Sequence, residues 1–332
     1  MSTSTITPGM IREAAERIRP LVKRTPLLTS HSLDERAGMK LFIKCENFQR
    51  GGAFKIRGAA NLILALTPEE RKGGIVAFSS GNHAQAVAIA ARHVGATATI
   101  VMPEDAPKSK MEPTRALGAK IVTYNRLKDD REAIAAKVLA ETGGILAPPY
   151  DHLTIMAGQG TIALELLEQE PELDALVTPV GGGGMASGCS IIAKDMRPGI
   201  RCFGVEPELG NDVWQSLQKG ERVSISSPDT IADGLRTLSP GKLTFPVLQR
   251  NLEQVLLVTE DEIRAAVRFL MERMKIVVEP SGAVGVAAAI HGKLPAGIRR
   301  AGIVISGGNF DPDLLKSLYN SAPDKLEVLP RC

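Results

Sequence analysis

The stretch LVTPVGGGGMASG, residues 176–188, decides the fold of this chain. Four consecutive glycines, Gly181 to Gly184, follow a β-branched apolar run and precede a helix start rich in small residues. A glycine-rich turn between a strand and a helix lets backbone N–H groups close around a phosphate. The stretch therefore predicts a strand–turn–helix unit whose turn binds the phosphate of a nucleotide or of a different cofactor.

The same alternation continues on both sides of this stretch. Short β-branched runs, such as GGIVAFSS (73–80) and AGIVISGG (301–308), alternate with Ala-rich helical patterns such as DDREAIAAKVLAETGG (129–144). This rhythm is typical of an α/β protein with parallel strands covered by helices on both faces. About ten strands are expected, which is near the limit of one open sheet, so we expect two open, twisted, mostly parallel sheets.

Three junctions between a strand and a helix are rich in Gly, Ser and Asn. They are AFSSGNHAQA (77–86), TPVGGGGMASG (178–188) and IVISGGNFD (303–311). Ligands of open α/β sheets bind beyond the carboxyl ends of the strands, so we expect these loops to share one cleft. From the rhythm we expect a large domain over 1–51 and 152–332, with a small domain inserted over 52–151.

Length and composition exclude several classes of protein. The 332 residues are 44% apolar and 23% charged, with a formal net charge of +3, as in an ordinary globular enzyme. No basic run predicts nucleic-acid binding, and no stretch approaches the roughly 18 apolar residues of a membrane span. The start MSTSTITPGM shows no signal peptide, so a cytoplasmic location is expected. No zinc spacing is present, and we expect reduced thiols at Cys45, Cys189, Cys202 and Cys332.

The glycine run has one interpretation as a dinucleotide site. Gly181, Gly183 and Ala186 satisfy the pattern G-x-G-x-x-A, and Glu206 stands 20 residues beyond Ala186, where an acidic residue could bind a ribose. No Lys-Ser/Thr pair follows the glycines, which argues against a P-loop. An NAD(P)-dependent Rossmann oxidoreductase therefore stays open as an alternative at this point.

A lysine in an apolar setting favours another cofactor. In ENFQRGGAFKIRGAANLI (46–63), Lys55 lies between Phe54 and Ile56, after a Gly-Gly turn. Most lysines are solvated charges, but a partly desolvated lysine loses its proton more easily. A neutral amine is what a Schiff base with an aldehyde requires.

Four motifs in order carry a resemblance to a known family. The segments FQRGGAFKIRGA, SSGNHAQAVA, GGGGMASG and SGGN resemble those of the serine/threonine dehydratase and serine racemase family, over about residues 10 to 315. These are fold-type-II enzymes that use pyridoxal 5′-phosphate (PLP). The resemblance implies PLP in a cleft between a large and a small domain, a small amino-acid substrate and a homodimer.

The resemblance also implies how PLP is held. Lys55 matches the lysine that bonds the cofactor as a Schiff base, and Phe54 matches a residue beside its ring, although a core phenylalanine is an equal interpretation. Asn82 matches the residue that binds the ring 3′-oxygen, and Ser306 the partner of the pyridine nitrogen. A hydroxyl there leaves that nitrogen largely uncharged, which suits β-elimination. The resemblance implies that the 5′-phosphate is bound by the backbone amides of Gly181, Gly182, Gly183, Gly184 and Met185.

Substrate contacts are implied in the same way. Ser79, Asn82 and His83 match a loop that holds the substrate carboxylate, although His83 alone could be structural. Ser80 matches the hydroxyl that racemases use as a second acid–base group, and is otherwise a helix cap. Arg131 matches a residue that reaches the substrate on domain closure, and is otherwise in a surface ion pair with Asp129 or Glu132.

A divalent cation is a further expectation. Glu206, the carbonyl of Gly210 and Asp212 match the ligands with which relatives bind such an ion. Oxygen ligands suit Mg²⁺, Ca²⁺ or Mn²⁺. The other interpretation is a pair of acidic residues in a solvated surface loop.

The implied reaction is the deamination of a β-hydroxy-α-amino acid to a 2-oxo acid and ammonia, by an ammonia-lyase of the EC 4.3.1 type. L-Threonine and L-serine are the expected substrates. The wording ENFQRGGAFK, with alanine before Phe54, also resembles threo-3-hydroxyaspartate dehydratases, so this substrate is an alternative, as are 3-phenylserine and serine racemisation. Because little sequence follows SGGN, a C-terminal regulatory domain is not expected.

Overall fold

The computed structural model describes residues 5–106, 108–125, 128–310 and 312–320. Its helices are α1 (Pro8–Ile18), α2 (His31–Ala37), α3 (Lys55–Ala65), α4 (Asn82–His93), α5 (Lys108–Ala116), α6 (Arg131–Thr142), α7 (Leu153–Gln169), α8 (Gly184–Met196), α9 (Asp212–Lys219), α10 (Phe245–Asn251), α11 (Glu260–Glu272), α12 (Pro280–Ile290) and α13 (Pro312–Asn320). Its strands are β1 (Leu27–Leu28), β2 (Lys40–Cys45), β3 (Ile75–Phe78), β4 (Ala98–Pro103), β5 (Lys120–Tyr124), β6 (Ile145–Leu146), β7 (Ala175–Pro179), β8 (Arg201–Pro207), β9 (Gln254–Val258) and β10 (Arg300–Ile305).

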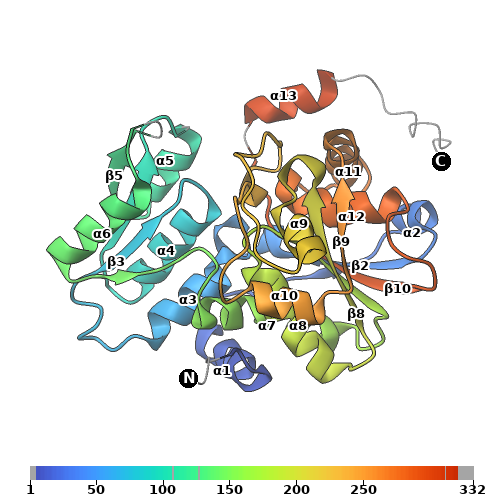
Figure 1. Cartoon of the computed structure of the whole chain (residues 1–332), viewed down its shortest axis with the longest axis horizontal. Helices are drawn as coiled ribbons and strands as arrows, with labels where there is room; N and C mark the ends of the chain where they lie inside the picture. Colours follow the sequence, from blue (N-terminus) through green and yellow to red (C-terminus); the bar gives the residue numbers. More distant parts are fainter. Residues whose placement is uncertain (1–4, 107, 126–127, 311, 321–332) are drawn as a thin grey trace.

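The strands form two separate sheets, as the sequence predicts (Figure 1). The six-stranded sheet has the order β1-β2-β10-β7-β8-β9, and only β1 runs antiparallel to its neighbour. The four-stranded sheet has the order β5-β4-β3-β6 and is parallel throughout. The predicted fold class is confirmed. All four strands of the smaller sheet fall within 52–151, while the domain boundaries themselves stay a prediction.

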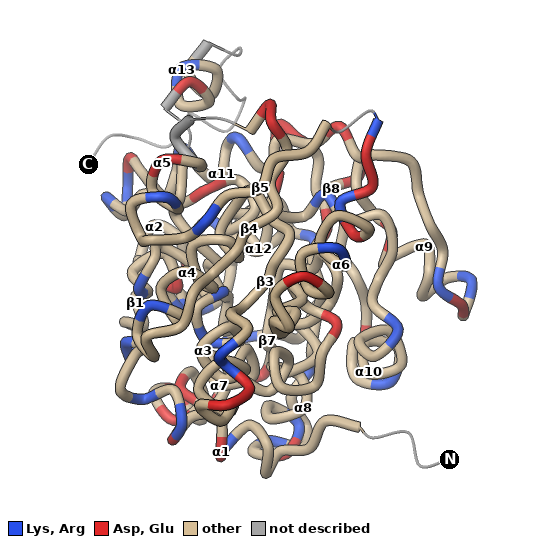
Figure 2. Tube along the Cα trace, turned by 90° about the vertical axis from the view of Figure 1, so that its left-hand side faces the viewer, with Lys and Arg blue, Asp and Glu red and all other residues tan. Residues whose placement is uncertain are grey.

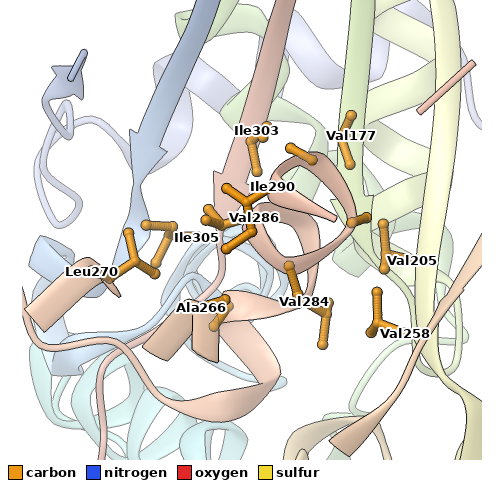
Figure 3. Packing of buried hydrophobic residues seen from close by; sticks show 14 of the residues in the cluster. Val177, Val205, Val258, Ala266, Leu270, Val284, Val286, Ile290, Ile303 and Ile305 are labelled. Atoms are coloured by element: carbon orange, nitrogen blue, oxygen red, sulfur yellow. The ribbon is translucent and has the colours of Figure 1, made fainter. Parts of the chain in front are cut away.

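The large sheet is covered on both faces because its strands alternate their side chains between two cores. On β7, Val177 packs with α11 and α12, whereas Leu176 packs with α7 and α8. Figure 3 shows the first core, where Val284 and Val286 of α12 lie against strand residues that include Val177. A strand buried on both faces reads as a continuous apolar run, which is what the sequence shows before the four glycines.

The small sheet repeats this arrangement with different helices. Ile75 and Ala77 of β3 pack with α3 and α4, while Val76 faces α6. Helix α3 packs against both α4 and α7, so it lies between the two sheets. The contact of α3 with α7 is close, since a Cβ atom on Gly158 would lie 2.5 Å from the carbonyl oxygen of Arg57. Glycine at this position lets the helix that begins with Lys55 rest directly on the large sheet's helical layer.

The surface carries both signs of charge. Figure 2 shows Lys and Arg interspersed with Asp and Glu along the chain, in keeping with the small net charge. Within the described ranges, no helix is both long enough and apolar enough to cross a bilayer. Cys45, Cys189 and Cys202 are buried free thiols, as expected, and Cys332 lies outside the described residues.

Candidate active site

Lys55 begins α3 and directs its amine to the segment that follows β6. Its Nζ donates a hydrogen bond of 2.8 Å to the carbonyl oxygen of Pro149 and lies 5.1 Å from the centroid of the Phe54 ring. Burial lowers the pKa of Lys55 to about 8, although the negative charge of Glu279 offsets part of the shift. An amine with such a pKa is partly neutral near physiological pH, which is the form that reacts with an aldehyde.

The segment before Lys55 is fixed by the loop that follows β10. The N–H of Phe54 donates to the carbonyl oxygen of Ser306 at 2.9 Å, and Ala53 forms an isolated antiparallel bridge with Gly307. Ser306 is buried. Two of the four motifs, separated by about 250 residues of chain, therefore lie against each other as the sequence predicts.

Asn82 connects a third motif to these two. The Asn82 Nδ2 group donates to Glu279 at 2.8 Å, and its Oδ1 accepts a 2.7 Å hydrogen bond from Asn309. Asn309 also donates to the carbonyl oxygen of Gly51. The side chain of Asn82, at the first position of α4, is thus engaged in long-range contacts.

The four glycines form the predicted turn between β7 and α8. Gly183 caps α8 with a φ of 90°, a left-handed conformation that favours glycine. The N–H groups of residues 181–186 donate to no acceptor within the described part of the chain. Unpaired donors at a helix N-terminus attract an anionic group.

Tyr150 brings the glycine turn next to the lysine. Its ring lies where a Cβ atom on Gly182 would have to be, and its backbone also approaches Gly184. Tyr150 follows Pro149, the residue whose carbonyl binds Lys55. The segment 147–151 therefore lies between the predicted phosphate turn and the predicted reactive amine.

The loop after β3 supplies the predicted substrate residues. Ser79 Oγ accepts a hydrogen bond of 3.2 Å from the N–H of Gly81, which is the N-cap of α4. Because no side chain caps α4, the alternative interpretation of Ser80 as a cap is wrong. His83 is buried, with Nε2 at 2.8 Å from the carbonyl oxygen of Ala147.

Arg131 lies on the same side of the small sheet as this loop. It begins α6, and its guanidinium carbon is 5.3 Å from the centroid of the Phe78 ring. Phe78 immediately precedes Ser79, so the cation stands beside the predicted carboxylate loop. Of its two expected surface partners, Asp129 accepts from the N–H of Asn125, and Glu132 donates its backbone N–H to Asp130, the N-cap of α6.

A cluster of buried charges lies behind Lys55, which we call the Arg57 cluster (Lys44, Glu46, Arg57 and Glu165). Arg57 donates to Glu46 at 2.7 and 2.8 Å and to Glu165 at 2.7 and 2.9 Å. Lys44 donates to Glu165 at 2.7 Å. Burial alone would raise the pKa of Glu165, but Arg57 and then Lys44 hold it below its usual value. The cluster joins the first turn of α3 to β2 and α7.

Glu206 and Asp212 form the second buried group of charges, which we call the carboxylate pair. Glu206 accepts from the N–H groups of Val213 at 3.1 Å and Trp214 at 2.8 Å. Asp212, at the start of α9, accepts from Thr237 Oγ1 at 3.2 Å. Burial raises the pKa of both carboxyls, and the charge of Asp212 raises that of Glu206 further.

These carboxylates have no ion-pair partner within the described ranges. Both are buried, so their alternative interpretation as a solvated surface pair is wrong. Gly210 lies between them in sequence, at the end of the 3₁₀ helix η3 (Glu208–Gly210). No cluster of three or more His, Cys, Asp or Glu side chains that could bind a metal was found in the part of the chain that the structure describes.

Comparison with known proteins decides the family. The model of the family described as "Pyridoxal-phosphate dependent enzyme" matches residues 18–307. The chain belongs to this family. It is 47% identical over 318 residues to an L-threo-3-hydroxyaspartate ammonia-lyase of Saccharomyces cerevisiae, covering 96% of this chain and 98% of that protein. It is 45% identical to a serine racemase of Schizosaccharomyces pombe, covering 91% and 93%.

A solved structure supports the same assignment. Maize serine racemase superimposes with a TM-score of 0.91 at 43% identity, covering 95% of this chain and 98% of that chain. The alternative interpretation as an NAD(P)-dependent oxidoreductase is therefore wrong. Glu206, which that interpretation assigned to a ribose, is instead buried on the backbone of α9.

The residues present fit PLP, the cofactor of this family. The unpaired N–H groups of the glycine turn suit a phosphate dianion, and the Lys55 amine, with its lowered pKa, suits an aldehyde. Sequence reasoning missed Glu279, Tyr150 and Asn309 as members of the site. Asn309 stood inside the quoted SGGN motif, whereas no local pattern distinguishes Glu279 or Tyr150, because their roles depend on tertiary contacts.

Proposed function

We propose that the protein is an ammonia-lyase that converts a β-hydroxy-α-amino acid into a 2-oxo acid and ammonia. The observation that carries the proposal is the half-buried amine of Lys55, which has a pKa lowered to about 8 and binds Pro149, next to the tyrosine that packs on the glycine turn. The similarity to ammonia-lyases over nearly the whole chain supports this reaction type. Overall, the β-hydroxyl leaves as water, and a water molecule then releases the amino group as ammonia.

PLP, when bound, supplies the electron sink that makes the α-proton of the amino acid acidic. Lys55 would take this proton at Nζ, since its lowered pKa leaves a fraction of the amine neutral. The glycine turn would hold the phosphate through residues 181–185, and Ser306 would meet the ring nitrogen. Asn82, which is held by Glu279 and Asn309, would bind the ring oxygen, and Phe54 would pack beside the ring.

The substrate carboxylate is assigned to the loop after β3. Ser79, Asn82 and His83 surround the N-terminus of α4, where the helix dipole favours negative charge. For the side chain of the substrate we propose L-threo-3-hydroxyaspartate first, then L-serine and L-threonine. Two relatives at 47% identity have that activity by name, and Arg131 offers a cation for a second carboxylate.

A panel assay tests this proposal. The oxo acid formed from L-threo-3-hydroxyaspartate, L-serine, L-threonine and 3-phenylserine is measured with the PLP-loaded full chain. We expect turnover of at least the first, loss of turnover in Lys55→Met, and loss of borohydride trapping of PLP in that variant. Trapping on a different lysine, or an inactive panel, would overturn the proposal. Arg131→Gln should raise KM for the dicarboxylate more than for L-serine.

Serine racemisation is a second candidate because Ser80 is half-buried in the loop after β3 and caps no helix. Relatives named serine racemase reach 45% identity over more than nine-tenths of the chain. Chiral analysis of the serine remaining after incubation would reveal D-serine. The variant Ser80→Ala should remove racemisation and leave elimination.

We also propose that the carboxylate pair, with the Gly210 carbonyl, binds Mg²⁺, Ca²⁺ or Mn²⁺. Two buried carboxylates without a cationic partner are costly, and a divalent ion with oxygen ligands would neutralise them. A homodimer and a cytoplasmic location remain predictions. Sedimentation of the full chain tests the first, and fractionation of the source cells tests the second.

A further inference from the structure

The surroundings of His83 determine which of its two ring nitrogens carries the proton. It is the second residue of α4, is 3% exposed, and places Nε2 at 2.8 Å from the carbonyl oxygen of Ala147. A carbonyl oxygen only accepts, so Nε2 carries the proton and Nδ1 carries a lone pair. Burial lowers the pKa of His83 to about 3, and the charge of Lys55 contributes, so the ring stays neutral.

The Nδ1 atom of this neutral ring lacks a partner. It is buried and accepts no hydrogen bond from any group in the described ranges. A buried acceptor that is left unsatisfied destabilises the folded state. A donor is therefore expected to reach Nδ1 in the working protein.

Lys55 is a donor close enough to His83 for its charge to lower the pKa of the imidazole. Its Nζ is bound to the carbonyl oxygen of Pro149, two residues after the Ala147 carbonyl that holds His83. One short segment thus receives the lysine from α3 and the histidine from α4. A protonated amine has three N–H donors, and Pro149 takes one of them. The charged group that faces the amine from a third element is Glu279, the residue before α12.

We propose that Lys55 Nζ, which contacts Pro149 and not His83 in this structure, donates a hydrogen bond to His83 Nδ1 when its side chain turns toward the ring, which makes His83 a positioning residue for Lys55. The inference rests on the role given to Lys55 in the proposed function. A neutral acceptor favours the protonated amine, so His83 would help Lys55 to keep a proton taken from the substrate. In this proposal the imidazole of His83 interacts with Lys55, and only the backbone of His83 contacts the substrate carboxylate.

Two substitutions separate the ring nitrogens. The amide of His83→Gln reaches the place of Nε2 and can still bind Ala147, but it leaves nothing at Nδ1. The amide of His83→Asn reaches the place of Nδ1. The full chain is stripped of PLP with hydroxylamine, and the rate at which it recombines with added PLP is followed by visible absorbance between about pH 6 and pH 10. The midpoint of this profile reports the pKa of Lys55.

For the unaltered protein we expect a midpoint near pH 8. In His83→Gln the midpoint should fall by about one pH unit, because a hydrogen bond to the charged amine is lost. In His83→Asn it should stay within about 0.3 unit, as the conservative variant restores the acceptor. Equal midpoints in the unaltered protein and His83→Gln, or equal falls in both variants, would overturn the inference.

If a His83 variant does not fold, the inference can be tested by NMR on protein in which His83 is intact. The ¹⁵N resonance of Nδ1, observed in the PLP-free full chain labelled at histidine, should move as Lys55 loses its proton. In Lys55→Met this movement should vanish, and a resonance that does not move in the unaltered protein contradicts the hydrogen bond. Failure of the unaltered chain to recombine with PLP would instead contradict the proposed function.

Discussion

Around Arg57 each buried charge has an opposite charge beside it, whereas Glu206 and Asp212 are like charges with no ion-pair partner in the described ranges. The Arg57 cluster balances Lys44 and Arg57 against two glutamates. The carboxylate pair is held by backbone N–H groups, by Thr237 and by a hydrogen bond between the two carboxyl groups. Both groups are removed from water, so the difference lies in how the cost of desolvation is offset.

This difference separates a structural role from a ligand-binding role. A neutral, fully bonded cluster needs nothing from outside, and it fixes the first turn of α3 without adding net charge beside the Lys55 amine. A like-charged pair lowers the free energy of unfolding at neutral pH until a cation or protons neutralise it. The direction of the pKa shifts follows the same division, lowered at Glu165 and raised at Glu206.

The largest effect is expected when Arg57 is replaced. Arg57→Met leaves Glu46 and Glu165 without their main partner, so the free energy of unfolding should fall by about 3–5 kcal/mol. Urea titration followed by fluorescence measures it. The control is Arg12→Met, which removes the exposed pair with Asp195 and should cost at most about 1 kcal/mol. Equal losses in the two variants would show that the cluster is no more than a surface ion pair.

The second effect belongs to the carboxylate pair. Mg²⁺, Ca²⁺ or Mn²⁺ at a hundred times its dissociation constant should raise the free energy of unfolding by about 2.7 kcal/mol. The variant Asp212→Asn should abolish this increase, because it removes one of the two carboxylates. Glu208→Gln, at an exposed acid in η3, should retain it. An increase that survives in Asp212→Asn would place the cation elsewhere.

The third effect is the opposite response of the two groups to pH. In cation-free protein the carboxylate pair binds more protons folded than unfolded, since folding raises both pKa values. Lowering the pH from 7 to 6 should therefore increase stability, by at most about 1.4 kcal/mol for each proton. The pKa of Glu165 is lowered, so its contribution is constant there and is lost only on further acidification, below its ordinary value of 4.5. Urea midpoints of the unaltered chain and Asp212→Asn should converge at the lower pH, and parallel curves would exclude the pair as the cause.

The smallest effect tests how completely the Arg57 cluster is bonded. Thr161 Oγ1 accepts a 3.1 Å hydrogen bond from Arg57, but Glu165 binds the same nitrogen. Thr161→Val should therefore cost only about 0.5–1.5 kcal/mol in urea titration. Thr178→Val removes a comparable buried hydroxyl on β7 and serves as the control. A loss as large as that of Arg57→Met would mean that Thr161 orders the whole cluster.

The sequence predicts the fold because local patterns and the global arrangement agree. Parallel strands buried on both faces produce apolar runs, and the helices between them carry recognisable ends, such as Asp130 before α6 and Gly143 after it. The four motifs also predict the site, because each lies at the carboxyl end of a strand or at a helix start. The order of strands in the two sheets is not readable from such local signals.

The parts that sequence reasoning missed depend on long-range contacts. Glu279 reaches Asn82 across 197 positions, and the carbonyls of Ala147 and Pro149 act through the backbone, which no residue type reveals. The burial of Glu206 and Asp212 was likewise invisible. The sequence around two acidic residues does not show whether their side chains are exposed to water or buried in the protein. Only the fold decides between these cases.

The bridge between Ala53 and Gly307 has a consequence for synthesis of the chain. Phe54 is held by the Ser306 carbonyl, and β10 inserts between β2 and β7 in the middle of the large sheet. A nascent polypeptide emerges from the ribosome amino end first, so its first 300 residues carry the lysine without the strand that positions it. Cofactor capture is thereby postponed until β10 has been made, and chains that stop before it lack the contacts that fix the segment before Lys55.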